Sequence, residues 1–172
     1  MPLIENTPIF IMDIVYNKAN MEIKKDIAND EIVVWDPKYA VGIKLIDDQH
    51  RELVNLTNQL FAACKVRSDS INTVFSETMK KMVEYVRFHF TAENSLLEHV
   101  RYPDIAEHKN QHDVLIKEIL ASVKNFNEGN KFVPNTFVRT LKEWIFGHIM
   151  VSDKAYSRYI LEQKKNGLLK DV

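Results

Sequence analysis

The sequence is poor in the residues that interrupt helices. Its 172 residues include four glycines and five prolines, where average usage would give about 12 and about 9. An all-β sandwich needs a turn roughly every 8–12 residues, so this scarcity argues against one and favours long helices. There is also a single cysteine, Cys64, which excludes an intrachain disulfide framework and fits a reducing compartment.

Long apolar runs and clusters of charge are missing as well. The longest apolar stretch near the N-terminus, 9–15, contains Asp13, whereas a membrane-spanning helix needs ~20 apolar residues. Glu5 stands where a signal peptide would carry positive charge. The net charge is −1, and scattered lysines and arginines predict neither nucleic acid nor an anionic membrane as a partner. We therefore expect a soluble, cytoplasmic protein.

Four segments between the breakers repeat apolar residues at steps of three and four, a pattern typical of helices in a bundle. The expected helices span 45–65, 71–99 and 104–127, with a fourth from just after Pro134 to 164. Asp47 or Asp48 is expected to cap the first helix. Short connections between the helices predict an all-α fold, an antiparallel up-down-up-down four-helix bundle with an N-terminal arm.

The chain divides into three parts in this interpretation. Residues 1–33 form the arm, with a short helix at 18–28, residues 34–164 form the bundle, and residues 165–172 form a polar tail that frays. The apolar stretch at 9–15 favours packing of the arm on the bundle, or contact with a protein partner or a second copy.

Histidines occupy positions on the helices where apolar residues belong. Residues four apart share a helix face, so two such side chains can bind one metal ion. A lone inward histidine is more often a hydrogen-bonded core residue than a ligand. Burying five imidazoles and a carboxylate without partners, however, costs several kcal/mol each, and metal coordination removes that cost. The predicted metal-binding set is His50, His89, Glu93, His108, His112 and His148.

Asp153 is harder to place from spacing alone. It lies five residues after His148, about 140° round an ideal helix, which favours a solvated charge. Continuing the three-and-four repeat of this helix past His148 predicts Val151 and Ala155 on the core face. However, Gly147 weakens the helix here, and a local π-bulge would bring positions i and i+5 together. The helix geometry at 147–153 decides between the two interpretations.

The number of ligands indicates two ions. A single Zn²⁺ takes four ligands, so five imidazoles with one or two carboxylates fit two ions with the carboxylates bridging. Imidazole and carboxylate together suit iron, zinc or copper. No glutamate is followed three residues later by histidine, the motif of carboxylate-rich di-iron proteins. A histidine-rich shell instead favours the reduced metal and reversible oxygen binding.

The sequence resembles the bacteriohemerythrins and hemerythrin-like proteins from about Trp35 to Tyr156. The matching motifs are VGIKLIDDQH at 41–50, HFTAE at 89–93, Tyr102-Pro103 followed by two histidines, and WIFGHIMVSD at 144–153. The resemblance implies two iron ions with an oxo or hydroxo bridge, and it restores Asp153 as a ligand. In that assignment one iron would be held by His108, His112 and His148, the other by His50 and His89, and Glu93 and Asp153 would bridge them.

The resemblance also implies a pocket for dioxygen at an open position on the two-histidine iron. Ile145 matches the family's apolar residue beside the bound oxygen, and Trp144 and Phe90 are further candidates, although core packing also explains all three. The sixth histidine, His99, lies outside the set and is expected to be solvated.

Three functions remain open at this point. The first is an oxygen carrier, store or sensor, which is not an enzyme. The second is a di-iron enzyme or stress protein, such as an oxidase, a peroxidase, or a nitric-oxide-reactive or iron-repair protein. The third is a structural bundle that holds zinc or no metal. The seven filled ligand positions oppose the third, and the missing glutamate–histidine motifs weigh against the second, so we expect the first.

Overall fold

The computed structural model describes residues 31–65, 71–128 and 134–169. Its long helices are α2 (Lys44–Ala63), α3 (Ile71–His99), α4 (Ile105–Asn127) and α5 (Pro134–His148). A π-helical turn, η2 (Ile149–Asp153), joins α5 directly to α6 (Lys154–Lys165). The four helices expected from the sequence are confirmed, the fourth being the continuous rod α5–η2–α6.

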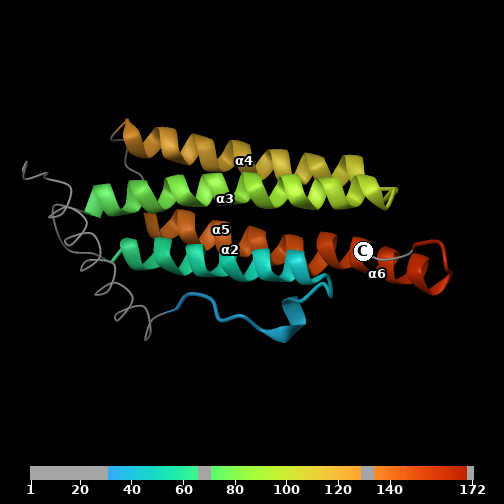
Figure 1. Cartoon of the computed structure of the whole chain (residues 1–172). Coiled ribbons are helices and arrows are strands. Elements are labelled where there is room, and N and C mark those ends of the chain that lie inside the picture. Colours follow the sequence, from blue (N-terminus) through green and yellow to red (C-terminus); the bar gives the residue numbers. More distant parts are fainter. Residues whose placement is uncertain (1–30, 66–70, 129–133, 170–172) are drawn as a thin grey trace, which may run out of the picture.

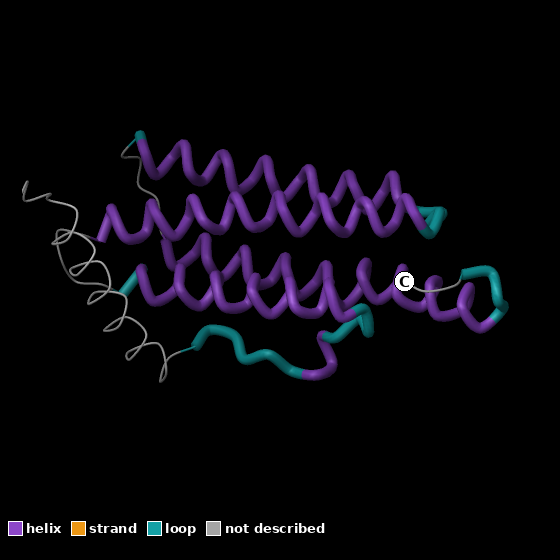
Figure 2. The backbone as a smooth tube through the Cα atoms, viewed as in Figure 1, coloured by secondary structure: helices purple, strands orange, loops and turns teal. Residues whose placement is uncertain are grey.

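The helices form an antiparallel four-helix bundle. Successive helices run in opposite directions, and α3 lies beside α4 while α2 lies beside α5 (Figure 1). The described part of the chain contains only helices, turns and loops (Figure 2). None of its helices is long and apolar enough to cross a membrane.

The apolar stripes of the helices meet in two separate clusters. The larger fills most of the bundle and includes Leu60, Met82, Ile119 and Leu141. The smaller surrounds Tyr156 near the α3–α4 turn. On α3 and on the α5–η2–α6 rod, Glu93 and Asp153 lie between the stretches that enter the two clusters, while His89 and His148 lie at the end of the stretch that enters the larger one. The sequence therefore places a polar layer across the bundle with apolar packing on both sides.

Residues 31–43, called the strap here, run along the outside of α2 and contain the short 3₁₀ helix η1 (Pro37–Tyr39) (Figure 1). The Asn58 side chain accepts from the Val33 N–H at 3.1 Å and donates to the Val33 carbonyl at 2.8 Å. The Asp47 carboxylate accepts from the N–H groups of Val41 at 2.6 Å and Gly42 at 3.0 Å. These bonds hold the strap on α2.

The prediction that Asp47 or Asp48 caps the first helix is wrong. The helix begins a turn earlier, at Lys44, and its N-cap residue Ile43 makes no side-chain capping bond. Asp47 instead accepts hydrogen bonds from two N–H groups of the strap. Gly42 has a positive φ of 81°, a conformation that glycine adopts without strain, and this turns the strap into the helix.

The strap also reaches the last helix. Lys154 donates to the Ala40 carbonyl, and the Ser157 hydroxyl donates to the Val41 carbonyl at 2.5 Å. The Tyr39 ring packs on Phe146 at 4.4 Å between ring centroids. The strap therefore joins α2 to the rod that carries the last two predicted ligands. The expected helix at 18–28 lies outside the described residues, and the division into arm, bundle and tail stays a prediction.

Candidate metal centre

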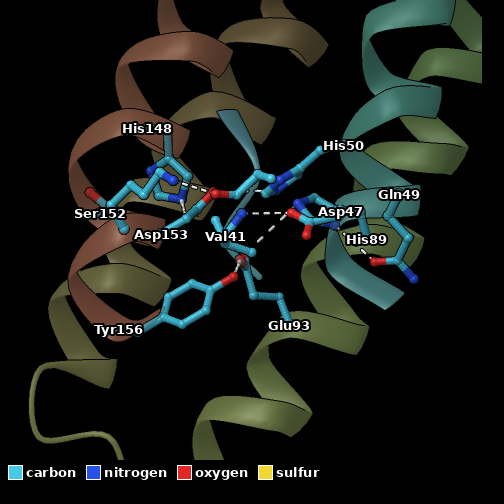
Figure 3. Close-up of polar contacts among 12 residues, drawn as sticks. Val41, Asp47, Gln49, His50, His89, Glu93, His148, Ser152, Asp153 and Tyr156 are labelled. Carbon is cyan, nitrogen blue, oxygen red and sulfur yellow. Dashed lines mark hydrogen bonds and ion pairs between the residues drawn. The ribbon is translucent and has the colours of Figure 1, made fainter. Parts of the chain in front are cut away.

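The structure brings all seven predicted ligand residues into one buried layer. Four helices and the π turn contribute them, and each side chain is at least nine-tenths buried. Figure 3 shows five of the seven pointing toward one another from these different elements. The layer consists of His50 on α2, His89 and Glu93 on α3, His108 and His112 on α4, His148 on α5 and Asp153 in η2. The sixth histidine, His99, is exposed, as expected.

The π turn explains how Asp153, five residues after His148, lies on the same face of the rod. Residues 149–153 are π-helical, and a π turn inserts one residue relative to an α-helix. Asp153 therefore lies on the His148 face, is fully buried, and has Oδ1 3.1 Å from His148 Nε2. The bulge hypothesis is confirmed, and the solvated charge that plain periodicity favoured is wrong.

The same turn shifts the apolar face of the rod by one residue. Val151, predicted in the core, is 69% exposed, and Ala155 is only partly buried. Tyr156 and Ile160 are buried in their place. A periodicity drawn through a π turn without allowing for its extra residue thus assigns the following helix to the wrong face.

The ligand atoms form two groups that share one carboxylate. Atoms from Glu93, His108, His112 and His148 all lie within 4.8 Å of one another, and so do atoms from His50, His89 and Glu93. Glu93 Oε2 is 3.1 Å from His112 Nε2, 3.3 Å from His108 Nε2 and 3.8 Å from His89 Nε2. Two adjacent positions for a cation result, with Glu93 between them.

Asp153 also lies between the same two groups. Its Oδ1 faces His148, and it also lies 3.7 Å from His108 Nε2. Its Oδ2 faces His50, 3.3 Å from Nε2. One carboxylate oxygen is therefore directed to each group, which is the arrangement a bridging carboxylate requires.

Unpaired polar atoms in the layer fit a pair of bound cations. Both oxygens of Asp153 and both ring nitrogens of His50 are buried without a hydrogen bond of acceptable geometry. Such atoms cost about 1–3 kcal/mol each when they stay unsatisfied. The five imidazoles meet through their Nε2 atoms and are accompanied by two carboxylates, a donor set suited to first-row transition metals.

In the metal-free chain, some of the predicted ligands already have the protonation state that metal binding requires. Burial lowers the pKa of His89 to about 4, so its ring is neutral at pH 7. Burial opposes ionisation of Glu93, yet hydrogen bonds from His108 and His112 hold its pKa well below the usual value. The pKa of His148 is raised, because contact with Asp153 outweighs its burial. A metal therefore has to displace a proton there.

Two residues that support the layer were not predicted. Gln49 Oε1 lies 3.0 Å from His89 Nδ1 (Figure 3), so His89 Nδ1 carries the proton and Nε2 is free to bind metal. The Tyr156 hydroxyl donates to Glu93 Oε1 at 2.6 Å. Burial, followed by the charges of Glu93 and Asp153, raises the pKa of Tyr156 well above its usual value. Their positions, directly before His50 and one turn after Asp153, are the only sequence signals that point to them.

A small internal cavity of about 10 Å³ adjoins the layer. His50, His89 and all three predicted pocket residues, Phe90, Trp144 and Ile145, lie on its wall. A space of this size holds about one water-sized molecule. The Phe90 ring stacks on His112 with centroids 3.6 Å apart, and Trp144 stacks on His148 at 4.6 Å. The pocket residues thus also fix the orientation of two histidines.

Comparison with known families gives one match that covers most of the bundle. Residues 41–160 match the model of the hemerythrin HHE cation-binding domain. A bacteriohemerythrin of Stenotrophomonas maltophilia is 31% identical over 126 residues, which are 73% of this chain and 80% of the relative. A hemerythrin-like protein of Naegleria gruberi is 30% identical over 122 residues, 71% of this chain and 88% of the relative.

Solved structures agree with the fold. A wild-type hemerythrin crystal structure superposes with a TM-score of 0.69 and 24% sequence identity, over 74% of this chain and 96% of that one. At this identity the likeness concerns the fold. The assignment of the seven residues as ligands rests on the geometry described above.

Proposed function

The chain belongs to the hemerythrin HHE cation-binding domain family, and from this premise we propose that it binds dioxygen reversibly at a di-iron centre, for transport, storage or sensing. The observation that carries the proposal is the buried layer of five imidazoles and two carboxylates arranged as two adjoining groups. The single cysteine is compatible with work in a reducing compartment such as the cytoplasm.

The two groups give each residue a role in this proposal. Three histidines would hold one iron and two would hold the other, and the small cavity adjoins the two-histidine group. Bound iron would supply the redox chemistry, a reversible transfer of electrons between the metal and dioxygen. Following the two groups, His108, His112 and His148 would hold one iron, His50 and His89 would hold the other, and Glu93 and Asp153, which face both groups, would be shared between them.

The surrounding residues fix the protonation of the predicted ligands and limit the size of the molecules that reach them. Gln49 fixes the tautomer of His89, and Tyr156 remains protonated and donates to Glu93. The cavity beside the two-histidine group has mostly apolar walls, including Phe90 and Ile145, and is too small for an organic substrate. These features support binding of a diatomic gas without turnover, and favour an oxygen-binding protein over an oxidase.

Iron content and visible absorption test the proposal together. The chain, loaded with ferrous iron under argon, should hold two irons and show a visible band in air that disappears when oxygen is removed. Repeated cycles without loss of the band support reversible binding. Two outcomes would favour an enzyme over an oxygen carrier. They are oxidation, within the first cycle, to a form that no longer responds to oxygen, and turnover of an added substrate. Loading of fewer than two irons would contradict the di-iron centre.

A further inference from the structure

An open groove of about 480 Å³ runs between α4 and the rod formed by α5 and η2. We call it the Gly147 groove and define it by Glu107, Gln111, Glu143, Trp144, Gly147 and His148. Its volume lies within the range of ligand-binding clefts, about 300–1,000 Å³. The oxygen-binding proposal gives this groove no role.

Gly147 weakens the helix just before η2, but neither a close contact nor a positive φ requires a glycine there. A glycine in a helix interior costs about 1 kcal/mol relative to alanine. Apart from its chain neighbours and its own helix backbone, no heavy atom lies within 4 Å of the place where a Cβ would stand, and the φ of Gly147 is not positive. A Cβ at this position would therefore meet no clash and no strained φ. The effect of the glycine is to leave the groove open beside His148.

The groove reaches the metal layer through two stacked rings. His148 is the most exposed of the seven predicted ligands, at 7%, and it lines the groove. The Trp144 indole stacks on His148 with an interplanar angle of 12°. Both side chains also line the internal cavity. Among the described residues, this ring pair is therefore a direct connection between a surface groove and the metal layer.

His148 is paired with the buried Asp153, and the other charged side chains that line the groove are both negative. They are Glu107 and Glu143, and no lysine or arginine lines it. The Ser152 hydroxyl donates to Gln111 Oε1 at 2.6 Å, and Gln111 Nε2 donates to Glu107 at 3.4 Å. The Glu107 carboxylate is thus held by a chain of hydrogen bonds that begins in η2. A cleft with charge of one sign concentrates ions of the opposite sign.

We propose that the Gly147 groove is where an electron-donor protein, with basic side chains around its redox group, docks and passes electrons through Trp144 and His148 to the iron. Each event oxidises the donor by one electron and reduces one ferric ion to ferrous, so two events restore a fully oxidised centre. Such encounters use small interfaces, and complementary charge raises their association rate more than their affinity. The inference rests on the di-iron proposal.

Fluorescence quenching in the metal-free chain tests the charge preference of the groove. The chain has two tryptophans, so the Trp35→Phe variant reports on Trp144 alone. Caesium should quench Trp144 more than iodide does, after correction with free tryptophan. The double variant Glu107→Gln/Glu143→Gln should remove that difference, and Gly147→Leu should reduce quenching by neutral acrylamide. As a matched control, Glu77→Gln/Glu84→Gln removes two exposed charges on α3 and should change nothing.

Reduction kinetics of the iron-loaded, oxidised chain test the electron path. Hexaammineruthenium(II) serves as the cationic donor and dithionite as the anionic one. The double glutamine variant in the groove should slow the cationic donor about tenfold at low salt, and should leave dithionite equally fast or faster. The difference should vanish at 1 M salt, where charges are screened within about 3 Å. The α3 control should retain the original rates.

Distinct results overturn the inference and the function. Equal quenching of Trp144 by caesium and iodide, or unchanged ruthenium rates in the groove variant, would overturn the docking site while reversible oxygen binding stands. Equal slowing in the α3 control would show that the rate depends on the net charge of the chain alone, and it would also rule out the docking site. A chain that never loads iron would remove the electron acceptor, and both proposals would fail.

Discussion

His89 and His99 lie on the same helix in opposite surroundings. His89 is buried in the metal layer and His99 is exposed. In the proposed assignment only two histidines hold the second iron, so losing one leaves that ion the weaker bound. We expect the His89→Ala variant to lose one iron to a chelator well before the other. Atomic absorption over the course of chelation measures this.

The matched control for that experiment is His99→Ala, which should retain both irons at the original rate. If His89→Ala released both irons together, or if His99→Ala behaved in the same way, the asymmetric assignment would be wrong. Circular dichroism of the metal-free variants verifies that each retains its helices.

The lowered pKa of His89 also makes the metal-free chain sensitive to acid. An unfolded histidine titrates near 6.5, whereas folded His89 stays neutral until about pH 4. Between these values the unfolded state binds the extra proton, so stability is complete above pH 6.5 and falls as the pH is lowered toward 4. His89 alone then costs about 2 kcal/mol between pH 7 and pH 5.

Urea unfolding of the wild type and the His89→Gln variant at both pH values isolates this contribution. Glu93, His112 and His148 titrate in both proteins, so their effects cancel to first order in the difference. The variant should lose less stability on acidification than the wild type. Equal losses in both proteins would show that His89 is not held neutral by burial.

At the scale of the element, η2 contains the equivalent of one inserted residue. Its exposed residue Val151 can be deleted, which converts the rod into a regular α-helix. The aspartate would then stand four residues after His148, and Tyr156 and Ile160 would keep their buried face. We expect the Val151 deletion to fold cooperatively without metal and to bind iron more weakly, because the Asp153 carboxylate and the Ser152–Gln111 bond shift.

Deletion of Lys142 in the regular part of α5 is the matched control. It rotates every preceding residue of α5 by about 100° relative to the metal layer, so broad and non-cooperative unfolding is expected. Urea unfolding followed by far-ultraviolet circular dichroism compares the two deletions. Similar disruption by both would mean that η2 is not a tolerated insertion.

The helices and most of the layer were accessible from the sequence because they follow period and spacing. The repeats of three and four located the four helices, and histidines on those repeats located five buried imidazoles. Asp153 was not accessible in this way, because the π turn that brings it inward adds a residue that a regular repeat does not contain. The resemblance to a family supplied it instead.

Other features depend on contacts that no local pattern contains. Asp47 looked like a helix cap, but the strap N–H groups compete for it. Val151 was placed on the wrong face by the extra residue of η2. Gln49 and Tyr156 act through partners on another helix, so their roles appear only once α2, α3 and α6 are assembled.

At the scale of the whole molecule, a polar layer separates two apolar clusters. Without metal the layer places unpaired nitrogen and oxygen atoms in the centre of the bundle, so metal binding should stabilise the entire fold. Ferrous iron at 100 times its dissociation constant contributes about 2.7 kcal/mol per site. For two sites in a chain of this size that corresponds to a rise of about 11–22 °C in Tm.

Anaerobic calorimetry with ferrous iron, and then with excess chelator, measures the shift. The His99→Ala variant should show the same rise as the wild type, and the Asp153→Asn variant a smaller one. An unchanged Tm in the presence of iron would contradict a metal site that spans the bundle.

The strap gives the molecule a non-covalent cross-link between distant parts of the chain. Lys154 and Ser157 meet Ala40 and Val41 across more than a hundred intervening residues, and closing so large a loop has an entropic cost that only the assembled bundle offsets. We therefore expect these contacts between the strap and α6 to form late in folding. Once formed, the contacts hold the first turn of α6, beside Asp153, in place during the local openings that release a metal ion.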